Sequence, residues 1–300
     1  MTLRIWLYYF LILLFVQLGV SLLIPLLMSP EQRQSGNPPD LSLLIAAQAL
    51  LAPWVVMATR IFVQQVDGKP LEAIGVVWPG GRWLVNGVGL AVGMLSFWTL
   101  LAYFGLDLEV LGRSTGSDIR SWWSSGFGFG LQLAGMAFAF LMVAVIEEWI
   151  FRGYLYSTLR ERFAWIHAAG LTALLYGLLL FGSEDITTPA LCNILLIAVI
   201  LAALREASGS VWVGAFFQGS WNFFLGCVLS LPVSGEFLPR LFEVRVEGSE
   251  PWTGGEYGPE GSWLLTMTLL ALLVSLVAWI GERPPLVPPE TEESSLDNDF

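Results

Sequence analysis

The chain has 300 residues, of which 55% are hydrophobic and only 13% are charged. Soluble domains carry roughly twice that share of charged residues, so the composition excludes an ordinary soluble protein and indicates a polytopic membrane protein. The net charge of −11 argues against a nucleic-acid-binding protein.

Eight apolar segments are predicted to cross the membrane as helices, which defines an all-α membrane bundle. They cover residues 5–28, 41–59, 83–104, 127–152, 164–182, 189–204, 210–231 and 262–280. The segments 105–125 and 232–261 are expected to be loops, and the second is rich in glycine and acidic residues. We divide the chain into residues 1–125 with three spans, a core at 126–281 with five, and a disordered acidic tail at 282–300.

The basic residues predict the orientation of the chain in the membrane. An even number of spans places both termini on one side. If that side is the cytoplasm, its segments contain nine of the 14 lysines and arginines. Positive residues are enriched in cytoplasmic loops, so we expect both termini to lie there.

The fourth span contains the residues that carry the most chemical information. Glu147, Glu148 and Arg152 interrupt an apolar run, and a charge at membrane depth costs from about 3 to well over 10 kcal/mol. Glu148 and Arg152 are four residues apart on one helix face, with the acid N-terminal to the base, so they can neutralise each other. A buried ion pair between helices would explain these two residues. It would leave Glu147, about 100° further round the helix, without a role.

Two amides form a second polar face on the seventh span. Gln218 and Asn222 are one turn apart and project the same way. Amides in lipid often join neighbouring helices, which is one interpretation of this pair. In a bundle that also holds Glu147 and Glu148, a shared polar cavity is the favoured interpretation.

An antiparallel hairpin of the fourth and fifth spans places Phe151 level with Tyr176. The same hairpin sets His167, the only histidine in the sequence, roughly 20 Å from Glu147. We therefore predict that His167 has no catalytic role.

These residues resemble motifs of the CPBP family, which comprises the CAAX prenyl proteases and bacteriocin-processing enzymes, intramembrane endopeptidases with about eight helices. The first motif is similar to Glu147-Glu148-x-x-x-Arg152. The second, aromatic-x-x-x-His, aligns with residues 176–180, and the third, His-x-x-x-Asn, with residues 218–222. The resemblance extends over about residues 138–270. Both motif histidines are replaced, by Leu180 and Gln218.

The resemblance implies that Glu147 is a general base that activates water, with Glu148 and Arg152 as a supporting pair and Asn222 as an oxyanion donor. Gln218 can still donate a hydrogen bond through its amide. Leu180 can hold neither water nor metal, and loss of an acid–base partner lowers a rate by about 10² to 10⁴. Without a histidine at this depth a zinc site is not expected, and we predict no metal and no other cofactor.

Three functions remain open from the sequence. The first is an intramembrane endopeptidase with a simplified site that uses Glu147. The second is a non-catalytic relative that binds membrane proteins or peptides in the inherited cavity. The third is a transporter with a carboxylate relay, a class that often shows internal repeats, which this sequence lacks. The expected partners are membrane lipid and a membrane protein or peptide, in a bacterial cytoplasmic membrane; the sequence fixes neither substrate nor oligomeric state.

Overall fold

The computed structural model describes residues 2–35, 41–113, 126–178, 186–235, 238 and 241–281. The longest helices are α1 (Thr2–Leu27), α3 (Leu41–Ile61), α4 (Gly81–Gly105), α6 (Gly126–Glu147), α9 (Thr188–Ser208) and α12 (Trp263–Gly281). Shorter helices are α2 (Pro30–Ser35), α7 (Tyr156–Arg160), α8 (Trp165–Leu178), α10 (Val211–Phe223) and α11 (Glu250–Thr253). Single 3₁₀ turns are η2 (Leu71–Ile74), η5 (Gly255–Tyr257) and η6 (Pro259–Gly261), and π-helical segments are η1 (Phe62–Val66), η3 (Glu148–Leu155) and η4 (Phe224–Val228).

The predicted fold class, an all-α membrane bundle, is confirmed. Within the described residues six helices are long and apolar enough to cross a membrane, and one of them continues from α6 through η3 and α7 to Arg160. The shorter helices α8 and α10 occupy the positions of the predicted fifth and seventh spans. The count of about eight is therefore consistent with the structure. The predicted tail at 282–300 lies outside the described residues.

The outer surface of α1 shows why the bundle needs lipid. Large apolar side chains are exposed along its length at intervals of three or four residues, including Leu3, Leu7, Phe10, Leu14, Leu18 and Leu22. A ridge of this size is far larger than the apolar patches that water-soluble monomers expose. Its backbone hydrogen bonds are satisfied within the helix, as a membrane requires.

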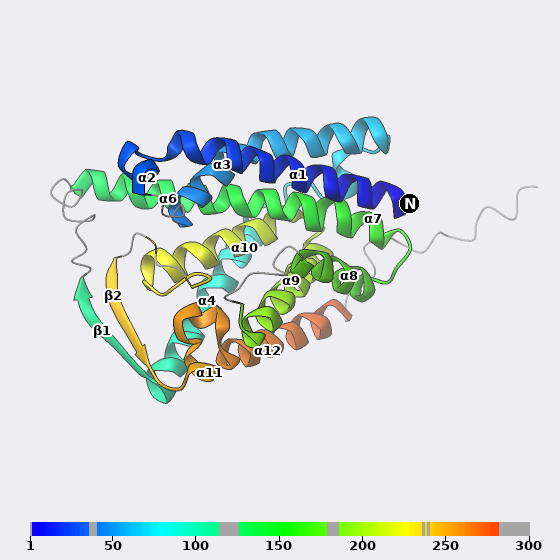
Figure 1. Ribbon diagram of the computed structural model, residues 1–300. Helices are drawn as coiled ribbons and strands as arrows, with labels where there is room; N and C mark the ends of the chain where they lie inside the picture. Colours follow the sequence, from blue (N-terminus) through cyan, green and yellow to red (C-terminus); the bar gives the residue numbers. More distant parts are fainter. Residues whose placement is uncertain are drawn as a thin grey trace, which may run out of the picture.

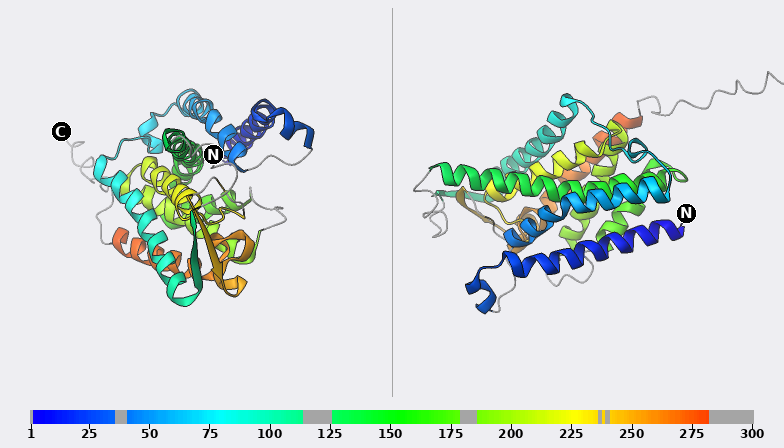
Figure 2. Two further views of the ribbon diagram at one scale, coloured as in Figure 1. Left: turned by 90° about the vertical axis from the view of Figure 1, so that its left-hand side faces the viewer. Right: turned by 90° about the horizontal axis from the view of Figure 1, so that it is seen from above.

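The helices form two packed groups with α10 between them. Helices α1, α3 and α6 run side by side, α3 in contact with both of the others (Figures 1 and 2). Helix α10 packs against α6, α4 and α9, and α9 in turn packs against α8 and α12. This central position lets α10 bring its side chains next to those of α6 and α8.

Local signals fix where α10 begins. Gly209 ends α9 with a φ of 72°, a conformation that glycine adopts without strain. The Ser210 hydroxyl then accepts a hydrogen bond from the amide of Trp212 and donates one of 2.6 Å to the carbonyl of Val77. The cap thus joins the start of α10 to the segment before α4.

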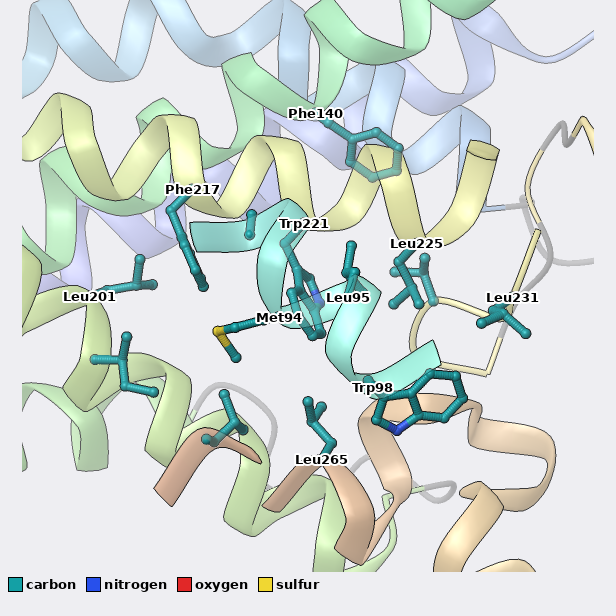
Figure 3. Close-up of a cluster of buried hydrophobic side chains, with 14 of the residues drawn as sticks. Met94, Leu95, Trp98, Phe140, Leu201, Phe217, Trp221, Leu225, Leu231 and Leu265 are labelled. Carbon is teal, nitrogen blue, oxygen red and sulfur yellow. The ribbon is translucent and has the colours of Figure 1, made fainter. Parts of the chain in front are cut away.

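The main apolar core lies where α4, α9, α10 and α12 meet. Figure 3 shows Met94, Leu95 and Trp98 of α4 facing Phe217 and Trp221 of α10, with Leu201 to the left and Leu265 below. Trp98 is fully buried, and its indole nitrogen donates to Ser262 at 3.4 Å. Burial of aromatic rings stabilises this contact and holds the inner face of α10 in place.

Two strands correct the prediction that residues 105–125 and 232–261 form loops alone. Strand β1 (Asp107–Arg113) pairs antiparallel with β2 (Phe242–Glu247), with Asp107 opposite Glu247, Arg113 opposite Phe242 and a register shift between Val110 and Gly112. The ribbon lies at the end of the bundle where α4 ends (Figure 1). Each strand is short and pairs with a segment far away along the chain, so no local turn signal predicts the pairing.

Candidate functional site

The predicted pair Glu148–Arg152 is present and fully buried. It lies in η3, a π-helical segment that interrupts the helix at its most polar point, where such irregularities often accompany function. Arg152 Nη1 is 3.2 Å from Glu148 Oε1, and the exposed fractions of the two side chains are 1% and 0%. Arg152 Nη2 donates to the carbonyl of Ala198 in α9 at 3.1 Å. The pair therefore ties η3 to α9 while neutralising both charges.

Aromatic rings complete the surroundings of Arg152. Its guanidinium carbon lies 5.4 Å from the centre of the Tyr176 ring, within the range of a cation–π interaction. The rings of Phe151 and Tyr176 meet edge to face, with centres 5.0 Å apart. The predicted level pairing of these two residues is thus confirmed.

Gly214 of α10 makes room for the Glu148 carboxylate. A β-carbon built at residue 214 would overlap Glu148 Oε2, so a larger residue cannot be accommodated without displacing that oxygen. The carboxylate cannot move freely because it is buried and paired with Arg152. The glycine is therefore required by the ion pair and by the close approach of α10 to α6.

We expect Gly214→Ala to lower the free energy of unfolding by about 1–3 kcal/mol, the usual effect of overpacking a filled interior. The matched control is Gly93→Ala in α4, where an added β-carbon meets nothing within 4 Å. Thermal unfolding of both variants in the same detergent measures the difference. Equal melting temperatures for the two would contradict the tight fit at residue 214.

Glu147 is the last residue of α6 and has partners on two other helices. The Tyr176 hydroxyl of α8 donates to Glu147 Oε2 at 3.0 Å. The Gln218 side-chain amide of α10 donates to the same oxygen. Helical spacing offers Glu147 no partner on its own helix, and its two donors are residues 29 and 71 positions further along the chain.

Three of the five predicted site residues meet at one cavity of about 420 Å³. Glu147, Gln218 and Asn222 line it, and so does Tyr176, whose hydroxyl the sequence analysis did not single out. Glu148 and Arg152 do not line the cavity and are buried in the protein. Leu180, the other replaced motif position, lies outside the described residues. His167 is exposed at the start of α8 and does not line the cavity.

A second carboxylate, Glu260, lines the same cavity and was missed by sequence reasoning. Its Oε1 accepts from the Trp221 indole at 3.1 Å, and its Oε2 accepts from the backbone amide of Ser234 at 2.9 Å. Burial raises the pKa of Glu260 above its usual value, although both donors act in the opposite direction. The available signal was a lone glutamate between two glycines and a proline at residues 258–261, immediately before an apolar helix.

Asn193 fixes the backbone that carries Glu260. Its side-chain nitrogen donates to the carbonyls of Glu260 at 2.8 Å and Ser262 at 2.9 Å, and its oxygen accepts from Thr266. Asn193 is completely buried, so these bonds satisfy a polar group that lipid and apolar side chains could not. They set the entry to α12 at a fixed position against α9.

The donor set at the cavity does not fit a histidine-ligated zinc ion. Among the described residues no group of three or more histidine, cysteine, aspartate or glutamate side chains is placed to hold a metal. The cavity instead offers two carboxylates, three side-chain amides and two phenols. These groups can position water, transfer protons and donate hydrogen bonds to a carbonyl oxygen.

The fold and the cavity together define a polytopic helical membrane protein with a buried, carboxylate-lined site. Residues 129–224 match the family model described as type II CAAX prenyl endopeptidase Rce1-like. The family resemblance is therefore confirmed over this segment, about a third of the chain, and together with the apolar helices it supports a CAAX-protease-like membrane protein. The matched segment includes Glu147, Glu148, Arg152, Gln218 and Asn222, and ends before Glu260. No curated protein and no solved structure matches the chain.

Proposed function

We propose that this protein is an intramembrane endopeptidase with an altered active site, in which Glu147 activates the attacking water. The observation that carries the proposal is that Glu147 faces the cavity and is held there by Tyr176 and Gln218 from two other helices. A general base needs a fixed position next to the space that the substrate enters. Both donors use Oε2, so we assign Oε1 to the water.

The amides supply the electrophilic side of the reaction. As water adds to a peptide carbonyl, negative charge develops on the carbonyl oxygen, and donors already aimed at it lower the barrier. Asn222 lines the cavity one turn beyond Gln218, and we assign its side-chain amide to this oxygen. Gln218 uses one N–H to hold Glu147 and has a second to offer.

The buried pair Glu148–Arg152 has a positioning role in this proposal. Glu148 and Arg152 neutralise each other, and Arg152 lies against the ring of Tyr176, whose hydroxyl holds Glu147. The substrate class is a membrane-embedded or membrane-attached peptide, in keeping with the apolar spans that surround the cavity. We place the protein in a bacterial cytoplasmic membrane with both termini in the cytoplasm.

The second candidate is a non-catalytic protein that binds membrane peptides in the same cavity. It is favoured by the replacement of the third-motif histidine by Gln218, because an amide transfers no protons and here restrains Glu147. In this function Glu147 is a hydrogen-bonding anchor for a bound segment. Binding without turnover is its expected result.

The test is a cleavage assay on the purified protein in lipid with a quenched membrane-peptide library. Glu147→Ala is the blank, and His167→Ala is the matched control, because His167 is exposed and does not line the cavity. We expect turnover in the unmodified protein and in His167→Ala, and none in Glu147→Ala.

A third variant separates the two candidates. Leu180→His combined with Gln218→His restores both motif histidines. Absence of turnover in the unmodified protein, together with turnover in this double variant, would overturn the proposed activity and support the binding function. Absence of turnover in both proteins would leave the proposed endopeptidase activity without support.

A further inference from the structure

Glu260 is a second carboxylate that lines the same cavity as Glu147. It lies outside the segment that matches the family model. We propose that Glu260 is the proton donor to the leaving amine and thereby replaces the acid–base histidine that this chain lacks. The inference rests on the proposed endopeptidase activity. It assigns to Glu260 a role, proton donation to the leaving amine, that neither Glu147 nor Glu148 has in that activity.

The Glu260 carboxylate is held in position on both oxygens. Trp221 donates to Oε1 and the Ser234 amide to Oε2. Ser234 adopts a φ of 50°, a conformation that non-glycine residues rarely take, and that conformation presents its amide to the carboxylate. Backbone strain of this kind collects at sites where exact placement matters, such as ligand and active sites.

Asn193 restrains the same residue from the backbone side, through the Glu260 carbonyl. The turn that contains Ser234 is also joined to η5, because the Gly235 amide donates to the Tyr257 carbonyl at 3.1 Å. Glu260 is therefore fixed by α9, α10 and the 230–235 segment together. A carboxylate that served only to close a loop would not need to face the cavity.

The surroundings of Glu260 favour its protonated form. Burial raises the pKa of Glu260, and among the residues that the structure describes no lysine or arginine lines the cavity. The titratable groups that face it are Glu147 of α6, Tyr176 of α8 and Tyr257 of η5. Arg152 is buried, is paired with Glu148 and is not among the residues that line the cavity.

A base and an acid that act in one reaction must hold one proton between them when the substrate enters, so one of these two carboxylates has to start protonated. Each carboxylate accepts two hydrogen bonds, but Glu147 also has a cation nearby. The Tyr176 ring, whose hydroxyl donates to Glu147, packs against the Arg152 guanidinium, and the charge of Arg152 favours the Glu147 anion. We therefore assign the retained proton to Glu260. The two residues then enter the reaction in opposite protonation states, one as base and one as acid.

The reaction balances with these two groups alone. Glu147 takes a proton from water as the water oxygen bonds to the peptide carbonyl carbon, and the carbonyl π electrons move to oxygen. When the carbonyl re-forms, the C–N bond breaks and the nitrogen receives the proton of Glu260. Glu147 then returns its proton to Glu260 through water. The products are one carboxylic acid and one amine.

The experiment is the pH dependence of cleavage by the full-length protein in lipid, with the quenched peptide that the library assay selects. An acid that must be protonated is lost as the pH rises through its pKa, so activity is expected to fall on the alkaline side. Glu260→Gln is expected to lower kcat by about 10²- to 10⁴-fold and to abolish that alkaline fall.

Trp221→Phe provides a second, independent readout. It removes the donor to Oε1 while leaving the carboxyl group, and a carboxylate that loses a donor is protonated more readily. The alkaline fall is therefore expected to move to higher pH. A residue that only anchors a loop would not produce such a shift. Thermal unfolding of each variant separates loss of fold from loss of chemistry.

The outcomes distinguish this inference from the proposed function. Turnover that depends on Glu147 but keeps its rate and pH profile in Glu260→Gln would overturn the role of Glu260 and leave the endopeptidase intact. A drop in rate that follows the melting temperature, with an unchanged pH profile in both variants, would also overturn it. Absence of any turnover in the unmodified protein overturns both.

Discussion

Replacement of Glu147 by glutamine is expected to lower the rate of peptide cleavage by about 10²- to 10⁴-fold while leaving the fold intact. The amide oxygen of a glutamine can still accept hydrogen bonds from Tyr176 and Gln218, so the wall of the cavity keeps its donors. The amide cannot take a proton from water. The loss therefore reports the missing base rather than a rearranged site.

Two further measurements distinguish loss of the base from loss of substrate binding. Glu147→Asp keeps a carboxylate on a shorter side chain, so it is expected to retain part of the activity that glutamine loses. Binding of an uncleaved membrane peptide to Glu147→Gln should resemble binding to the unmodified protein. Equal cleavage by Glu147→Gln and the unmodified protein would show that another group activates the water.

The second large effect is expected in stability, at the buried ion pair. Arg152→Met leaves the Glu148 carboxylate in the protein interior without its partner, and loss of one member of a buried pair destabilises by about 3–5 kcal/mol. The variant also loses the hydrogen bond to the Ala198 carbonyl. We expect a large fall in melting temperature or failure to accumulate in the membrane.

The compensating double variant distinguishes charge from packing. Glu148→Leu with Arg152→Met replaces both charges by apolar groups, and such replacements of whole buried pairs are often neutral. We expect the double variant to recover most of the stability that Arg152→Met loses. A double variant as unstable as the single one would assign the effect to the Ala198 contact and to packing, measured by unfolding in detergent.

The sequence was informative about this protein wherever the signal was local. The span boundaries follow from apolar runs, and α12 differs from its predicted range by one residue at each end. The Glu148–Arg152 pair follows from helical spacing and is present at 3.2 Å. The level pairing of Phe151 with Tyr176 follows from the antiparallel hairpin and is present as a ring contact.

The parts that the sequence did not reveal depend on contacts between distant segments. The Tyr176 hydroxyl reaches Glu147 only because α8 packs beside the end of α6, and the strands pair only once the bundle has formed. Glu260 lies in a stretch of turn-forming residues whose composition indicates a loop, and its place in the cavity is set by Asn193 and Trp221. The catalytic roles of all these residues remain predictions until turnover is measured.

The ribbon of β1 and β2 has a consequence for how the protein is made. Strand β1 ends at Arg113 and its partner begins at Phe242, so the 128 residues from 114 to 241 must be translated before the two can pair. At about 5–20 residues per second this takes roughly 6–26 s. During that interval β1 presents an open strand edge, which is prone to pair with other chains. Slow translation or late membrane insertion of α9 and α10 would lengthen this exposure, so we expect the yield of folded protein to fall when translation is slowed.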